Sequence, residues 1–489
     1  MKLGQECLGY GKLFLWNQGV ASRGKMMGKT FATPDHLQPL PKSPASEGNG
    51  RLWTFSYHLD PSILQRNDLR VPLYMSPIDP LFQDMDDSSR RYLYHFATTL
   101  CEDLVISDVP NNNPFRSLIP TCRDHLILLH IIVANAAMHI SSMSRPGFTS
   151  YMGSVESPFP DNSADSPAGA TLDALSAKHK AIHLLQKSLT NLPSADVDLI
   201  VTVILLFINL ELIDSGKNAW RAHVEGAMKL ISSLKPFEND QTSPIALIRD
   251  RITSDCLTYH VLGSTLTNPT TFLDPFALPI DITTILRRSE ANSCLSLPTA
   301  LLRILFRACE LSNLAFALSS TETPALIAEA SSLLSATQSF DVAAWANSVE
   351  GAPPRRTPNR IHTALAHQRA VCIYIYRSIA HPPGDMSPEL LVTEIVYHLS
   401  FIDPKDPLSK ATSWPTFIAG VETDNPVYRQ WALDRLNRLW NVLPWGYVQT
   451  AVEVMQMAWT LRDRPAPDSM GAGGWVQQLK ALGNHWLIA

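Results

Sequence analysis

Two long apolar segments within a chain of amphipathic patterns place the strongest constraint on the fold. Residues 125–143 (HLILLHIIVANAAMHISSM) are apolar nearly all round, and residues 199–213 (LIVTVILLFINLELI) are the most apolar run. A helix that is apolar on every side has to be covered by other helices. The second run is shorter than the ~18 residues of a membrane span, and Asn209 and Glu211 interrupt it. Both segments therefore predict buried central helices, without membrane association.

Helical periodicity continues along the rest of the chain from about residue 86. Tyr92, Phe96, Leu100 and Leu104 recur every four residues, with Asp87 or Ser88 available as a cap, and Leu172, Leu175, Ile182, Leu185 and Leu189 share one helix face. Further helices are expected over 171–191, 196–213, 219–234, 243–266, 298–319, 323–337, 360–380, 388–402, 425–441 and 446–461. Period-two alternation and repeats of fixed length are absent from the sequence. We therefore predict an all-α fold, with one large irregular helical domain over residues 86–489.

Two segments of different composition precede this domain. Residues 1–30 carry five basic residues against Glu6 alone, a net charge of +4. Residues 31–85 are rich in Pro, Ser and Gly and predict a flexible linker. The whole chain has a net charge of −5. This balance excludes a globally basic nucleic-acid binder but leaves room for a local basic arm.

The cysteines and the N-terminus indicate the compartment. Seven cysteines are scattered without any CxxC spacing, which argues against a disulfide framework and favours a reducing compartment. The first residues, MKLGQECLGY, lack the apolar core of a signal peptide. We expect a protein that is not secreted.

One string and one histidine pair resemble catalytic or metal-binding patterns. DMDD (84–87) has the DxDD form of class II terpene cyclases, but it stands where a helix begins, so N-capping is the favoured interpretation of Asp86. His179 and His183 have the i, i+4 spacing of a zinc pair, but no further ligand motif accompanies them. Phosphate-binding loops and nucleophile motifs are missing as well. The sequence predicts no enzyme, and a terpene-cyclase-like activity is kept as a remote alternative.

Four strings together resemble one family, the fungal zinc-cluster (Zn2Cys6) transcription factors with their fungal-specific regulatory domain. In chain order they are NPFRSLIP (113–120), AWRAHVEGAMKLI (219–231), WPTFIAGVE (414–422) and YRQWALDRLNRLW (428–440).

Packing is the role we expect for two of these strings. Pro415 suits a first helical turn with Trp414 beside it, and Gly226 with Ala227 would permit close helix approach. The expected apolar stripe of the second string consists of Trp220, Val224, Ala227, Leu230 and Ile231. Residues that contact a ligand are not identifiable in either string.

The N-terminus resembles the end of a zinc cluster. Cys7, followed by Gly9 and Tyr10, aligns with the last of the six zinc ligands, and a basic segment comes next. One cysteine cannot hold two tetrahedral zinc ions, so the chain as given should bind no zinc unless upstream cysteines exist. Two explanations for the five missing zinc ligands stay open. The gene model starts too late, or a shorter protein has lost DNA binding.

The resemblance implies a regulator of RNA polymerase II genes in a fungal nucleus, acting on a metabolic or secondary-metabolite pathway. It implies DNA phosphate contacts by Lys12, Arg23, Lys25 and Lys29. It also implies a homo- or heterodimer with related factors and a small-molecule effector. The alternative is a helical interaction protein that does not bind DNA and modulates a full-length relative.

Overall fold

The computed structural model describes residue 82 and residues 85–108, 113–145, 166–190, 197–234, 244–267, 274–278, 280–293, 295–318, 324–379, 382, 384, 386–463 and 474–489. The chain divides into residues 1–70 and residues 71–489, and all described residues belong to the second unit.

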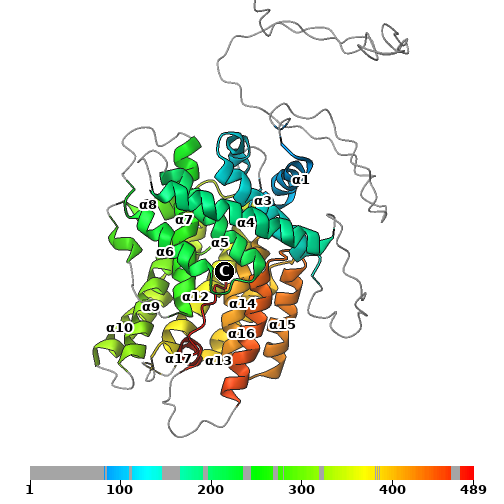
Figure 1. The fold of residues 1–489 in the computed structure, drawn as a ribbon. Coiled ribbons are helices and arrows are strands. Elements are labelled where there is room, and N and C mark those ends of the chain that lie inside the picture. Colours follow the sequence, from blue (N-terminus) through cyan, green and yellow to red (C-terminus); the bar gives the residue numbers. More distant parts are fainter. Residues whose placement is uncertain are drawn as a thin grey trace, which may run out of the picture. The chain divides into compact units, whose positions relative to one another are not determined.

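The described part of the chain is built from helices and contains no β-strand, which confirms the all-α prediction (Figure 1). Its α-helices are α1 (Asp87–His95), α2 (Cys101–Asp103), α3 (Leu126–Met143), α4 (Pro167–Thr190), α5 (Val197–Asp214), α6 (Trp220–Ile231), α7 (Pro244–Thr265), α8 (Ile282–Ser289), α9 (Thr299–Ala317), α10 (Pro324–Ser339), α11 (Val342–Ser348), α12 (Thr357–Arg377), α13 (Pro388–Ser400), α14 (Ser413–Glu422), α15 (Pro426–Trp440), α16 (Gly446–Arg462) and α17 (Trp475–Ala481). Short 3-10 helices connect some of them, including η4 (Arg116–Leu118), η5 (Pro120–Arg123) and η10 (Pro407–Thr412).

The two apolar segments form central helices, as predicted. Every residue of α5 from Ile200 to Ile213 is buried, and most of α3 is buried as well. Helix α3 is long and apolar enough to cross a membrane, but 78% of it is buried inside the protein. Apolar side chains on all sides of these helices are therefore covered by neighbouring helices rather than by lipid.

The start of α1 confirms the capping interpretation of Asp86, whereas Asp87 and Ser88, the other candidate caps, lie inside the helix. The Asp86 backbone is extended, and its Oδ1 accepts a hydrogen bond of 2.9 Å from the Ser89 amide. An N-cap needs this non-helical backbone, whereas Asp87 is already inside the helix. The four-residue repeat from Tyr92 to Leu104 is buried because a π-helical turn, η3 (Phe96–Leu100), keeps its members on one face.

The predicted apolar face of α4 packs against the protein only in part, because Ile182 and Leu185 contact the core whereas its other leucines do not. Leu172 and Leu175 are 67% and 50% exposed, and Leu189 is also exposed. The buried side is an alanine face that packs against α3, made of Ala170, Ala174, Ala177 and Ala181. Small side chains let two helices approach closely, so the alanines determine which face of α4 packs against α3, even though leucine is more apolar.

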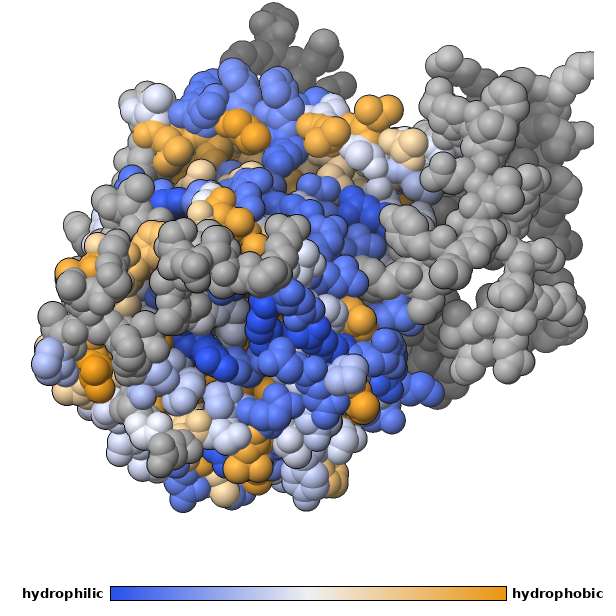
Figure 2. Space-filling view, turned by 90° about the horizontal axis from the view of Figure 1, so that it is seen from below, coloured by the Kyte–Doolittle hydropathy of each residue, from blue (hydrophilic) through white to orange (hydrophobic). Residues whose placement is uncertain are grey.

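The face shown in Figure 2 carries both polar and apolar groups. Figure 2 shows hydrophilic residues across much of the lower face, with apolar residues in separate groups between them.

Three short helices within the described residues, α8, α11 and α17, were not expected from the sequence. Each spans at most eight residues, too short for a clear helical period.

Candidate functional site

Helix α14 holds the WPTFIAGVE string at the centre of the C-terminal half. All ten of its residues are buried, and the Trp414 side chain is 1% exposed. Pro415 is the third residue of the helix, so its missing N–H falls in the first turn, where no helical partner exists. The packing role expected for Trp414 and Pro415 agrees with this burial.

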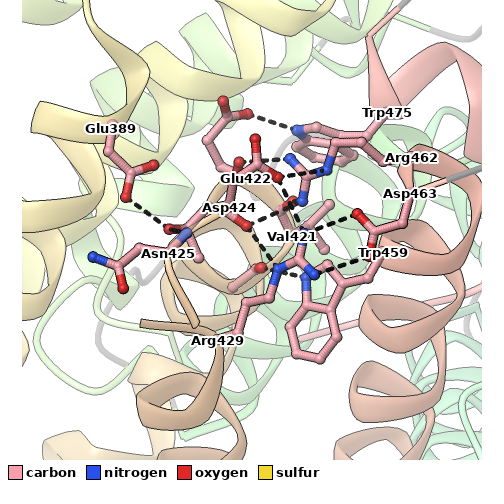
Figure 3. A network of polar contacts seen from close by, with 12 residues as sticks. Glu389, Val421, Glu422, Asp424, Asn425, Arg429, Trp459, Arg462, Asp463 and Trp475 are labelled. Atoms are coloured by element: carbon pink, nitrogen blue, oxygen red, sulfur yellow. Dashed lines mark hydrogen bonds and ion pairs between the residues drawn. The ribbon is translucent and has the colours of Figure 1, made fainter. Parts of the chain in front are cut away.

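The last residue of α14, Glu422, carries a carboxylate that is almost fully enclosed (Figure 3). Arg377 at the end of α12 donates from Nε to Glu422 Oε2 at 2.9 Å and from Nη2 to Oε1 at 2.5 Å. Trp475 at the start of α17 donates from Nε1 to Oε2 at 2.8 Å. The hydrogen bonds to Glu422 raise the pKa of Arg377. Because an anion at a helix C-terminus opposes the helix dipole, Glu422 depends on these donors.

Arg462 at the end of α16 satisfies the carbonyl groups at the same helix end. It donates to the backbone oxygens of Val421 and Glu422 at 2.7 Å each, and to that of Thr423 at 3.1 Å. The last carbonyls of a helix lack partners within the helix, so Arg462 acts as a side-chain cap. Burial lowers the pKa of Arg462, whereas the carboxylate of Asp424 acts in the opposite direction.

An outer set of contacts links α15 and α16 to this helix end. Arg429 donates to Asp424 and to Asp463, both at 3.1 Å, and its guanidinium lies over the Trp459 ring at 5.1 Å (Figure 3). Trp459 in turn donates from Nε1 to the Gly420 oxygen at 2.8 Å. We call the inner and outer contacts together the α14 junction. It joins α12, α14, α15, α16 and α17 through charged hydrogen bonds.

The second family-like string forms α6, and its packing differs from the prediction at two positions. Trp220, Val224, Ala227 and Ile231 are buried as expected, but Met228 is buried in place of the partly covered Leu230. The close approach predicted at Gly226 is wrong, because no atom lies within 4 Å of the place where its Cβ would be. Gly226 therefore faces open space.

The close approach occurs at Gly263 of α7, which the sequence did not indicate. A Cβ there would lie 2.2 Å from Trp220 Cη2. The indole also donates from Nε1 to the His485 oxygen at 3.2 Å, so Trp220 connects α6 with α7 and with the C-terminal segment. Glycine at 263 is the residue that leaves room for this ring.

One of the two polar residues that interrupted the apolar run of α5, Glu211, has charged partners. Glu211 is buried, and Lys178 of α4 donates to it at 2.6 Å. Burial alone would raise the pKa of Glu211, but the contacts with His223 and Lys178 lower it below its usual value. This charge pair holds α4 against α5.

Most of the predicted functional residues lie outside the described residues. These are Cys7, Lys12, Arg23, Lys25 and Lys29, and the structure provides no geometry for them. The candidate zinc pair lies within the described part, where His179 and His183 are both exposed on α4. Groups of three or more His, Cys, Asp or Glu residues that could hold a metal ion do not occur among the described residues.

Acid catalysis by DMDD has no support in the described part of this string. Hydrogen bonds from Ser89 lower the pKa of Asp86, whereas a catalytic acid needs a raised pKa.

The described cysteines are buried, and burial raises their pKa values well above the usual range, to about 12 for Cys122 and for Cys372. Buried neutral thiols of this kind serve packing.

The two most distinctive strings form packing elements of a large helical unit, as the resemblance to the fungal regulatory domain implied. Comparison with known families agrees, because residues 91–488 match the fungal-specific transcription factor domain. The chain belongs to this family, which indicates a transcriptional regulator.

One curated relative extends this assignment. The chain is 35% identical over 481 residues to the acriflavine sensitivity control protein acr-2 of Neurospora crassa. The match covers 94% of this chain and 75% of that protein. No solved structure matches the chain.

Sequence reasoning missed the α14 junction, although one signal for it was present. The string WPTFIAGVE ends in a glutamate after a nearly continuous apolar run. A charged residue at the end of a buried helix suggests a buried ion pair. Its partners are 45 and 53 residues away in the chain, at Arg377 and Trp475, and no local pattern points to them.

Proposed function

We propose that this protein regulates RNA polymerase II genes in a fungal nucleus and contacts DNA through its basic N-terminal arm. The match of residues 91–488 to the transcription factor domain carries the proposal. Lys12, Arg23, Lys25 and Lys29 would bind phosphates, adding affinity that does not depend on base sequence. Cys7 would be the last zinc ligand of a cluster completed by upstream cysteines. The protein would bind as a homo- or heterodimer, which sets the spacing of half-sites.

Binding of the native protein to DNA tests this proposal. Protein isolated from its source fungus should bind a CGG-containing duplex with nanomolar affinity at physiological salt. Replacing the four basic residues by alanine should weaken binding to CGG-containing and scrambled duplexes alike. It should also reduce the slope of log K against log salt by about 3.6, because each phosphate contact contributes ~0.9. Fluorescence anisotropy across a salt series measures both effects.

The opposite result would favour the alternative function. If the native protein binds both duplexes only weakly and loses them as salt rises, it acts through other proteins and modulates a full-length relative. Light scattering on the same samples should give twice the monomer mass in the absence of DNA. A monomer would contradict the proposed homodimer.

We further propose that the genes under its control set the sensitivity of its fungus to acriflavine. The support is the identity to the Neurospora protein, whose name states that role. Deleting the gene should shift the acriflavine concentration that halves growth, and the reintroduced gene should restore the original value. Unchanged sensitivity would place the target genes in another pathway. A small-molecule effector that binds the helical domain completes the proposed mechanism.

A further inference from the structure

Two histidines on neighbouring helices turn the same ring nitrogen toward each other. Helices α12 and α13 pack against each other (Figure 1), with His362 in the second turn of α12 and His398 in the last turn of α13. Their Nδ1 atoms lie 3.1 Å apart, and both side chains are partly buried. This pair differs from His179 and His183, which share one exposed helix face, because tertiary packing already brings its two nitrogens together.

Aromatic side chains of α13 and its C-cap hold both imidazoles in place. The His362 ring stacks on the Phe401 ring, with centroids 4.2 Å apart and an interplanar angle of 12°. The His398 ring packs against the Tyr397 ring in a T-shaped contact, with centroids 5.3 Å apart. Packing of this kind fixes the orientation of potential ligands before anything binds. Because Tyr397 and Phe401 are themselves about half exposed, the histidine pair lies at the surface, where water and ions reach it.

The outward nitrogens of this pair leave the inward ones able to accept. Among the described residues neither Nε2 atom has a hydrogen-bond partner, and neither is cut off from solvent. Each Nε2 can therefore direct its proton to water and leave a lone pair on Nδ1. Two lone pairs facing each other at this distance repel. They are stabilised by a shared cation, which is either a proton in an N–H···N hydrogen bond or a metal ion bound by both nitrogens.

Additional protons compete weakly for this pair at neutral pH. Burial, with the charges of His362 and Arg369 added, lowers the pKa of His398 to about 4. The carboxylate of Glu394 acts in the opposite direction. Burial also lowers the pKa of His362. Both imidazoles are therefore neutral at pH 7, and the neutral imidazole is the form that binds transition metals.

The separation of the two nitrogens fits a single metal ion. With metal–nitrogen bonds of about 2.0–2.1 Å, nitrogens 3.1 Å apart subtend about 95–102° at the metal, between the octahedral and tetrahedral angles. Imidazole suits zinc, copper and nickel, whereas magnesium and calcium prefer oxygen ligands. We propose that the Nδ1 atoms of His362 and His398 bind a divalent transition-metal ion such as Zn²⁺, with water in the remaining positions. The ion links the start of α12 to the end of α13, and this site goes beyond the proposed function because it requires neither DNA nor the N-terminal cluster.

Zinc binding by the full-length chain tests this site. The host for every measurement carries His179→Ala and His183→Ala, which removes the exposed pair on α4 as a competitor. Loss of a group that only orients a zinc ligand weakens binding by about 10–100-fold, so loss of a ligand should weaken it at least about tenfold. Isothermal titration calorimetry should therefore show that increase in the zinc dissociation constant for His362→Ala and for His398→Ala. Equal zinc affinity of the host and of both variants would overturn the proposal.

Copper provides a measurement that does not require either variant to fold. Electron paramagnetic resonance of the host with one equivalent of Cu²⁺ should show coupling to two imidazole nitrogens. His398→Ala in the same host, with unchanged circular dichroism, should show coupling to one. Coupling to fewer than two nitrogens in the host would overturn the proposal. A host that binds neither ion at micromolar concentration would also overturn it and would assign the pair a shared proton.

Discussion

Arg377→Met should lower the free energy of unfolding by about 1.5–3 kcal/mol, because the buried Glu422 loses its charged hydrogen bonds while the one-third exposed Arg377 makes the pair weaker than a fully buried one. The Glu422 side chain is 3% exposed and would keep only the Trp475 indole as a side-chain donor. Its place at the C-terminus of α14 adds to the loss, because the helix dipole disfavours an anion there. Urea unfolding followed by far-UV circular dichroism measures the change.

Two further variants show whether geometry or charge is responsible. Arg377→Lys should recover only part of the lost stability, because an ammonium group cannot reproduce the forked contact of a guanidinium. Glu329→Ala removes an ion pair to Arg307 in which both side chains are about half exposed. This control should change stability by less than about 1 kcal/mol. Equal effects of Arg377→Met and Glu329→Ala would show that the α14 junction contributes no more than a surface pair.

Trp220→Ala should lower the free energy of unfolding by about 3–5 kcal/mol, because it leaves a cavity where a buried indole packed. Gly263→Ala should lower it by about 1–3 kcal/mol through overpacking against the same ring. In the Trp220→Ala background the added methyl group finds space. There, Gly263→Ala should be neutral or stabilising by up to about 1 kcal/mol, since alanine favours a helix. A double-mutant cycle therefore measures the contact between α6 and α7.

Gly226→Ala is the matched control for this cycle. Both glycines lie within helices, but only Gly263 faces another side chain at close range. Gly226→Ala should therefore leave stability unchanged or raise it by up to about 1 kcal/mol. Additive effects of Trp220→Ala and Gly263→Ala would contradict the inferred contact, because residues that do not interact show no coupling.

The helix positions were largely predictable because they depend on neighbours in the sequence. The predicted segments 388–402 and 446–461 correspond to α13 (Pro388–Ser400) and α16 (Gly446–Arg462). Apolar residues at helical spacing, with proline at the start of a helix, define such elements locally. The short helices α8, α11 and α17 lack enough turns for such a pattern.

The candidate site was less predictable because its contacts join distant segments. The strings around Trp220 and Trp414 identified α6 and α14 as packing elements, and both residues are buried. The sequence did not reveal that Glu422 meets Arg377, or that Gly263 lies beneath Trp220, since neither pair is close along the chain. The proposed arm and zinc ligand remain predictions.

The sequence by itself determined the all-α class, the two central helices, the helix cap within the DMDD string and the family, because each depends on residue type and spacing along the chain. Tertiary structure alone decided which face of α4 is buried, which glycine accommodates Trp220 and how Glu422 is neutralised. These outcomes depend on contacts between residues far apart in the chain, such as the 265 positions between Trp220 and His485. Close packing depends on the shapes and charges of residues that meet in space, and local periodicity does not encode which residues meet.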